Sequence, residues 1–97
     1  MKQSSLKFIK VDVSSLAPPE PMTIILKHLA TLTHHECLLV KHRRQPFPLY
    51  EKLNDAGFSY HCVEHANNDI ELYIFHLSSQ NLFDKTLSNI DIKIGDN

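Results

Sequence analysis

Two proline-rich segments divide the first half of the chain, and each lies between a strand-like and a helix-like stretch. The first ends in Pro18-Pro19-Glu20-Pro21, and the second reads Gln45-Pro46-Phe47-Pro48. Proline fixes φ and lacks an N–H, so it interrupts a helix but is accommodated in a helix's first turn. Each segment therefore marks a place where a strand has ended and a helix begins. The repeat predicts two strand–helix units in succession.

The apolar spacing within each unit supports this interpretation. Residues 8–13 alternate as a strand, with Ile9, Val11 and Val13 on one face. A helix is expected to begin near Glu20 or Pro21, and its buried face has helical spacing: Met22, Ile25, Leu26, Leu29 and Leu32. The second unit has a strand at 37–42 and a helix at 49–56. Gly57 can end that helix because glycine tolerates a left-handed turn.

Two further strands, 58–65 and 70–77, form a predicted hairpin around Ala66-Asn67-Asn68-Asp69. If His65 pairs with Ile70, then Val63 and His61 share the helix-covered face with Leu72 and Ile74. The opposite face then carries the remaining large side chains: Phe58, Tyr60, Cys62, Tyr73, Phe75 and Leu77. An exposed aromatic patch needs a cover. The C-terminal segment, a second copy of the chain and a partner protein are the three alternatives.

The predicted fold is therefore α/β, more specifically an α+β two-layer sandwich of order βαβαββ. Two helices cover one face of a four-stranded mixed sheet. Residues 1–77 form this domain, and residues 78–97 form a C-terminal extension. Residues 90–94 alternate, so the extension is expected to add a fifth strand or to be a frayed tail.

Composition narrows the classes of function. The chain has 97 residues and a net charge of −1, which gives no general attraction to nucleic acid or to a membrane. It has no apolar run near the ~20 residues that span a bilayer, and its start does not resemble a secretory signal. A single cytoplasmic domain is expected. Cys37 and Cys62 lie within strand patterns, which favours free, buried thiols.

The motifs resemble those of the TusA/SirA-like family of sulfur carriers, in which a Cys-Pro-x-Pro motif opens the first helix and its thiol carries persulfide. Here Pro18 stands at the cysteine position of Pro18-Pro19-Glu20-Pro21. A more similar group is an uncharacterised bacterial branch with Pro-Pro-Glu-Pro-Met, then His/Asp-x-Arg-x-Pro-x-Pro-Leu-Tyr, then Gly-Phe. The chain matches these at residues 18–22, 42–50 and 57–58. The resemblance spans roughly residues 8–77 and implies this fold, without an established activity.

The main candidate site is an anion site at the two proline-rich turns, formed by Glu20, His42, Arg44 and Tyr50. Parallel first strands would bring two helix N-termini together, with unpaired N–H groups and partial positive charge. Arg44 would hold an anionic ligand or an acidic partner side chain, Glu20 would orient Arg44, and His42 would change charge with pH. The alternative is an Arg44–Glu20 ion pair that only ties the turns together.

Three other functions stay open. The histidines and cysteines could bind a metal, although neither 34–37 nor 61–65 has a recognised ligand spacing. A sulfur-trafficking role without the motif cysteine is the second, and RNA binding through residues 41–44 is the third. No nucleophile–base pair, carboxylate pair or phosphate loop is visible, so we expect a non-enzymatic binding or regulatory domain without a cofactor or resident metal. A homodimer through Phe58, Tyr60, Tyr73 and Phe75 is a further expectation.

Overall fold

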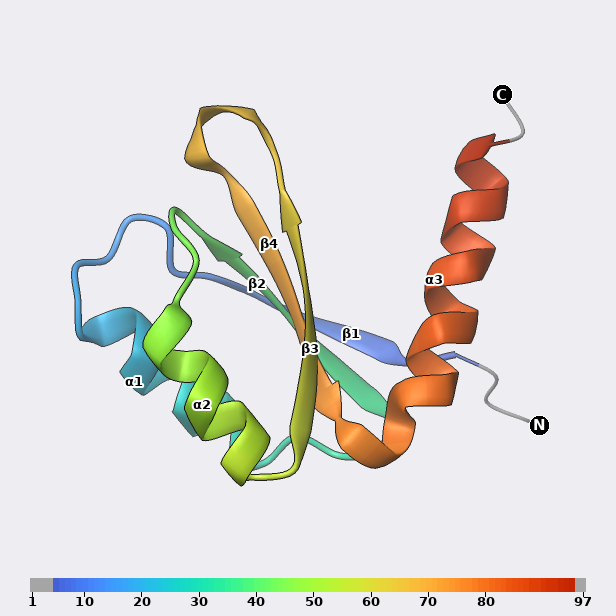
Figure 1. Cartoon of the computed structure of the whole chain (residues 1–97), viewed down its shortest axis with the longest axis horizontal. Coiled ribbons are helices and arrows are strands. Elements are labelled where there is room, and N and C mark those ends of the chain that lie inside the picture. Colours follow the sequence, from blue (N-terminus) through green and yellow to red (C-terminus); the bar gives the residue numbers. More distant parts are fainter. Residues whose placement is uncertain (1–4, 96–97) are drawn as a thin grey trace.

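The computed structural model describes the backbone of residues 5–95 and the side chains of residues 5–88. Four strands and three helices alternate with two short 3-10 turns (Figure 1). The elements are β1 Lys7–Asp12, α1 Glu20–Leu29, β2 Glu36–His42, α2 Phe47–Asp55, β3 Phe58–Glu64, η1 Ala66–Asn68, β4 Ile70–His76, η2 Leu77–Ser79 and α3 Gln80–Gly95. The predicted order βαβαββ is confirmed as far as β4.

The four strands form one mixed sheet in the order β1-β2-β4-β3. β1 pairs with β2 in parallel, whereas β4 is antiparallel to both β2 and β3. Because β1 and β2 run in the same direction, the turns that follow them leave from the same end of the sheet. The β3–β4 loop lies at that end as well, since His42 at the end of β2 pairs with Ile70 at the start of β4. We call this the turn end of the sheet.

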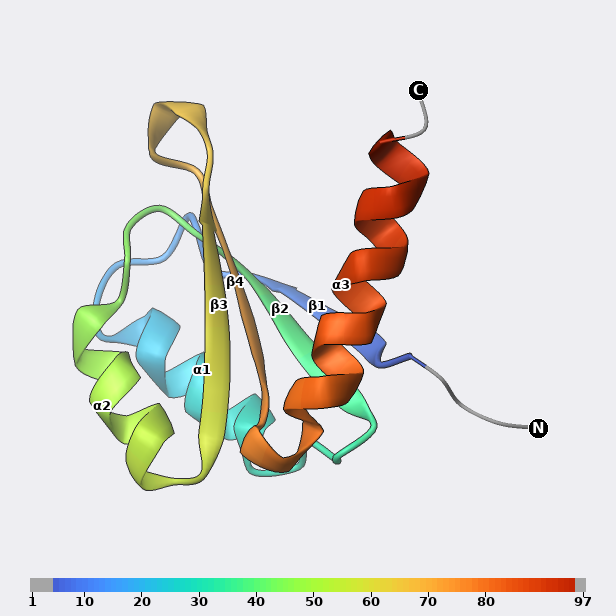
Figure 2. The ribbon, with the colours of Figure 1, turned by 45° about the vertical axis from the view of Figure 1, so that its right-hand side comes forward.

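α1 and α2 cover one face of the sheet, as predicted (Figures 1 and 2). Ile25 and Leu29 of α1 and Leu49 and Leu53 of α2 are buried in a single cluster. Their partners are the inward residues of the sheet: Val13, Leu38, Val40, Phe58, Leu72 and Ile74. Gly57 follows α2 with φ +85°, a conformation that suits glycine and ends the helix as expected.

The β3–β4 hairpin has a different register from the predicted one. Glu64, not His65, pairs with Ile70, and His65 donates its N–H to the carbonyl of Asp69 at 2.7 Å. The loop is one residue longer than expected, residues 65–69 instead of 66–69, and within it Asn67 and Asn68 both adopt positive φ, which asparagine tolerates better than most residues. A one-residue slip moves every side chain of a strand to the other face.

This slip overturns the predicted faces of β3, whereas those of β4 are confirmed: Leu72 and Ile74 lie beneath the helices, and Tyr73 and Phe75 lie on the other face. Phe58, Tyr60 and Cys62 pack with the core beneath α1 and α2. Their cross-strand partners are His76, Ile74 and Leu72, whereas the residues expected beneath the helices, His61 and Val63, pair with Tyr73 and Glu71. The four aromatic residues expected to form a dimer face therefore do not share one face.

The far face of the sheet is covered at one end by α3, which is one of the three expected covers (Figures 1 and 2). Phe83 is 2% exposed and stacks on Phe75 with ring centroids 4.1 Å apart. Leu6 and Cys37 complete this second buried cluster, and Thr86 accepts the Leu6 N–H at 3.0 Å. The fifth strand considered for residues 90–94 is wrong, because that backbone is helical. Among the described residues, no helix has the length and apolar character needed to cross a bilayer.

Candidate binding pocket at the proline-rich turns

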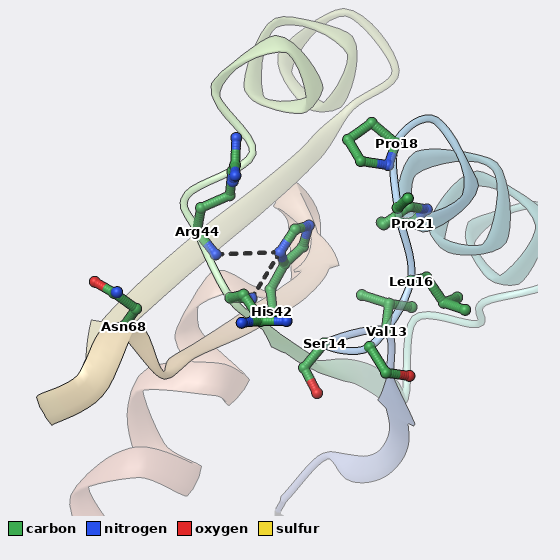
Figure 3. Close-up of a pocket in the computed structure, with 11 residues that line it drawn as sticks. Val13, Ser14, Leu16, Pro18, Pro21, His42, Arg44 and Asn68 are labelled. Carbon is green, nitrogen blue, oxygen red and sulfur yellow. Dashed lines mark hydrogen bonds between the residues drawn. The ribbon is translucent and has the colours of Figure 1, made fainter.

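The two proline-rich turns come together at the turn end of the sheet and line two adjoining hollows, the first of which is drawn in Figure 3. The first, which we call the polar hollow, has a volume of about 420 Å³ and lies between residues 13–18, the His42–Arg44 turn and Asn68. The second, the proline hollow, has a volume of about 310 Å³ and is lined mainly by proline rings. Pro18, Pro21, His42 and Arg44 line both hollows, so the two are parts of one pocket.

The proline hollow takes its character from the identical way in which the two helices begin. Pro19 caps α1 and Pro21 lies in its first turn, and Pro46 and Pro48 occupy the same positions in α2. With Pro18, these are all five prolines of the chain, and every one lines the proline hollow. Because proline has no N–H, this wall presents ring carbons and few hydrogen-bond donors.

His42 lies at the junction of the two hollows and is only 8% exposed. Its Nδ1 accepts the backbone N–H groups of Arg43, at 2.9 Å, and Arg44, at 3.3 Å. Since Nδ1 accepts, the proton of the neutral ring is on Nε2. Burial, and then the positive charge of Arg44, lower the pKa of His42. The ring is therefore neutral at physiological pH, and the charge change that we expected of it moves to more acidic pH.

The Nε2–H of His42 faces the pocket. Figure 3 shows Nδ1 facing the Arg43–Arg44 backbone, whereas the opposite edge of the ring faces Pro18 and Pro21. Within the described part of the chain, Nε2 has no hydrogen-bond partner, yet no side-chain nitrogen or oxygen there is both buried and unpaired. Nε2 therefore opens to the pocket and offers it a hydrogen-bond donor.

Arg44 brings positive charge to both hollows, whereas Arg43 lines only the polar one. Its backbone is fixed by His42, and its exposed side chain runs along the rim (Figure 3). The expected alternative, an ion pair between Arg44 and Glu20, is not formed: the only side-chain ion pair among the described residues joins His65 to Glu71. The guanidinium is thus available to a ligand.

The helix N-termini offer fewer free N–H groups than we expected. In α1, Glu20 donates its N–H to Ala17, and Pro21 has none. In α2, Phe47 and Leu49 donate theirs to Gln45 and Pro46. The remaining attraction for an anion is the helix dipole, worth about 0.3–1 kcal/mol for each helix. Side chains, rather than helix ends, must therefore provide most of the recognition.

Two of the four predicted site residues are absent from the lining of the pocket. Glu20 is exposed and lines neither hollow. Tyr50 is half-buried and stacks on Tyr60 with ring centroids 4.0 Å apart. Its hydroxyl donates to Gln45, whose amide in turn donates to Glu64, so Tyr50 fastens the second turn to β3. Burial, and then the neighbouring Cys62, raise the pKa of Tyr50 far above its usual value. The structure gives Tyr50 a supporting role.

Both cysteines lie away from the pocket lining. Cys37 is buried under α3, and burial raises the pKa of its thiol to about 12. Cys62 is half-buried and packs against the core beneath the helices. Neither thiol lies at a helix N-terminus, where a sulfur carrier of the family that the sequence resembles holds its cysteine.

The side chains predicted for a metal site and for an RNA site do not gather into such sites among the described residues. Across the described residues, no three histidine, cysteine or acidic side chains come close enough to hold a metal ion. His34 instead stacks on His76, with ring centroids 3.9 Å apart. The basic run at 41–44 is divided: His42 is buried, and Lys41 lies in register between Asp12 and Glu71. A continuous basic patch for RNA is not formed there.

Sequence reasoning missed several residues of the pocket wall. Ser14 and Ser15 belong to the first turn, and Asn68 reaches the polar hollow from the hairpin loop. The pair Asn67-Asn68 signals a turn, but placing it beside His42 requires knowing that β4 lies next to β2. The sequence indicated that the prolines begin two helices, but not that their rings line a pocket.

Comparison with known proteins yields one match. The model of a family described as uncharacterized conserved protein (DUF2249) matches residues 10–76, a segment that includes both turns and all four strands apart from the start of β1. Neither curated proteins nor solved structures give a match.

Proposed function

The chain belongs to the DUF2249 family of uncharacterized conserved proteins, and for this member we propose a non-enzymatic binding or regulatory role. The domain recognises an anionic group, carried by a small ligand or by a protein partner, in the pocket between the proline-rich turns. The observation that carries this proposal is the buried His42 ring, whose Nε2–H opens to a pocket also lined by Arg44, a side chain without an ion pair among the described residues.

The chemistry of the pocket supports binding rather than catalysis. A neutral histidine donor and a guanidinium can together hold a carboxylate or a phosphate oxygen. The lining side chains include Ser14 and Ser15 as well as prolines and Asn68, without a thiol or a carboxylate among them. The Ser14 hydroxyl donates to Asp12, and Nδ1 of His42 accepts two backbone N–H groups, so Ser14 is not paired with His42 as a nucleophile is with its base.

Kinship with the TusA/SirA-like carriers is part of the proposal. What supports it is the βαβαββ order and the Pro19-Glu20-Pro21 start of α1. A sulfur-trafficking role would need a thiol at the turn, and Pro18 occupies that place, so we propose that this chain uses the same end of the fold to bind an anion. A cytoplasmic location belongs to the same proposal.

An amide-resolved NMR titration tests the proposed function. Acetate and inorganic phosphate are added separately to the full chain, and we expect the amides of residues 14–17 and 43–45 to shift in a saturable way. Arg44→Gln removes the charge and should weaken binding about three- to tenfold. Lys27→Gln, in the last turn of α1, removes the same charge away from the pocket and is the matched control.

Two results would contradict the proposal. The first is the absence of saturable shifts at the turns with either anion. The second is equal weakening by Arg44→Gln and Lys27→Gln, because this would assign the effect to net charge and not to the pocket.

A further inference from the structure

The two hollows differ in chemistry, and His42 and Arg44 stand where they meet. The polar hollow carries Arg43, Ser15 and Asn68, whereas the proline hollow carries five prolines and Met22. A ligand that reaches the Nε2–H of His42 therefore touches both kinds of surface, because His42 lines both hollows. This difference between the hollows restricts the chemistry of the rest of the ligand as well as its charge.

The proline hollow can satisfy very few polar atoms. Its five prolines bring no N–H groups, and the side-chain amide of Gln45 is already engaged by Glu64 and Tyr50. Polar ligand atoms placed there would lose water without gaining partners, which is costly. An apolar group, in contrast, is stabilised by burial against the proline rings and Met22.

The donors at the junction fit a carboxylate better than a phosphate. Two side-chain donors line it, the Nε2–H of His42 and the Arg44 guanidinium on a long exposed side chain, and a carboxylate has two oxygens to accept them. Phosphate sites usually add several backbone N–H groups at a helix end. Here proline removes those groups, and neighbouring carbonyls engage the N–H groups of Glu20, Phe47 and Leu49.

We propose that the pocket binds a small organic acid, with its carboxylate between His42 and Arg44 and an apolar body in the proline hollow. This inference rests on the proposed function and narrows its ligand to one chemical class. The size of the proline hollow, about 310 Å³, lies at the lower end of ligand pockets and limits the body to roughly one ring or a short acyl chain.

Four probes separate the two parts of this ligand. Phenylacetate has both the carboxylate and the apolar body, acetate lacks the body, phenylacetamide lacks the charge, and inorganic phosphate replaces the carboxylate. Each is titrated into the full chain, and dissociation constants are taken from the amide shifts of residues 14–17 and 43–45. We expect phenylacetate to bind about tenfold or more tightly than any of the other three.

Two variants locate the carboxylate. His42→Asn places Oδ1 where Nδ1 was, so it can still accept the N–H groups of Arg43 and Arg44 while losing the Nε2–H donor. It should weaken phenylacetate binding about tenfold and leave the dispersion of the amide spectrum unchanged. Arg44→Gln is the second variant, at an exposed side chain, and should weaken it about three- to tenfold.

The possible failures are distinguishable. If acetate or phosphate binds the same amides as tightly as phenylacetate, the organic-acid inference is overturned while the anion site stands. If phenylacetamide binds as tightly as phenylacetate, or if no probe moves these amides, both the inference and the proposed function fail. If His42→Asn leaves phenylacetate binding unchanged, the assignment of the carboxylate to His42 is wrong.

Discussion

Two replacements of His42 distinguish its contribution to the stability of the turn from its contribution to ligand binding. His42→Ala removes the acceptor of two backbone N–H groups, at 2.9 and 3.3 Å, and also the packing of a ring that is 8% exposed. A hydrogen bond between neutral groups contributes about 0.5–1.5 kcal/mol. Two of them, with the lost ring contacts, predict a loss of about 2 kcal/mol in the free energy of unfolding.

The matched variant, His42→Asn, should cost much less. Its side-chain oxygen is attached to the same carbon position as Nδ1 and can accept both N–H groups, as asparagine does in turns. We expect a loss of about 0.5–1 kcal/mol, from ring contacts alone. The two variants should therefore differ by about 1 kcal/mol or more.

Urea unfolding monitored by circular dichroism measures the difference, and thermal unfolding checks it. For a domain of this size, a loss of 2 kcal/mol lowers Tm by roughly 8–16 °C. Equal losses in the two variants would refute the reasoning, because the Nδ1 acceptor would then contribute nothing to the turn. A loss below about 0.5 kcal/mol in both would show that the turn holds its shape without His42.

Four further predictions address other parts of the molecule. Burial lowers the pKa of His42 in the folded chain, so as the pH falls the unfolded chain binds a proton at His42 more readily than the folded chain does. The free energy of unfolding of the wild type should therefore fall relative to that of His42→Asn between about pH 7.5 and about pH 5. A difference between the two proteins that does not change with pH would contradict this. Phe83→Ala should cost about 3 kcal/mol, because it empties a site that is 2% exposed, whereas Leu77→Ala, at an exposed side chain, should stay within about 0.5 kcal/mol in the same urea assay. Iodoacetamide, followed by mass spectrometry, should leave Cys37 unmodified in the native chain and label it in urea; rapid native labelling would contradict its burial under α3. Arg44→Gln should change Tm by no more than a few degrees, since the side chain has no ion pair among the described residues, and a large loss would indicate a structural role instead.

Local sequence patterns predicted the helices and strands well where the covalent structure of a residue restricts the backbone, as proline does. The Pro-x-Pro starts fixed the beginning of α1 to within a residue, because proline is accommodated at a helix start and excluded from its interior. The start of α2 lies two residues earlier than predicted, which is within the usual uncertainty of helix ends. Strand alternation located β1, whereas β2 was located as a short β-prone run, since it is buried on both faces: Cys37 on one, Leu38 and Val40 on the other.

The hairpin shows where such patterns stop being sufficient. β3 carries large side chains at alternate positions on one face, Phe58, Tyr60 and Cys62, while β4 has apolar residues on both faces because α3 covers the second one. Alternation in β4 therefore cannot select the register of the hairpin, and the conformation of the loop sets it instead. Two successive asparagines with positive φ give the observed register. An asparagine in the sequence permits positive φ but does not require it.

The candidate site was half predictable for a related reason. His42 and Arg44 follow from chain position, because parallel strands bring both turns to one end of the sheet. The exclusion of Tyr50 and Glu20 depends on side-chain directions at the start of two helices, which spacing alone does not give. Asn68 depends on the strand order, and that order is set by non-local pairing.

The prolines also explain why this end of the fold is suited to a different chemistry from that of a sulfur carrier. A thiolate or persulfide at a helix start is stabilised by the free N–H groups of the first turn and by the helix dipole. In this chain the cap and first-turn prolines remove several of those groups, and carbonyls of the turns engage those of Glu20, Phe47 and Leu49. Introducing a cysteine, as in Pro18→Cys, should thus give a thiol with little stabilisation from backbone donors. Anion recognition would remain with His42 and Arg44, whose donors do not depend on the helix ends.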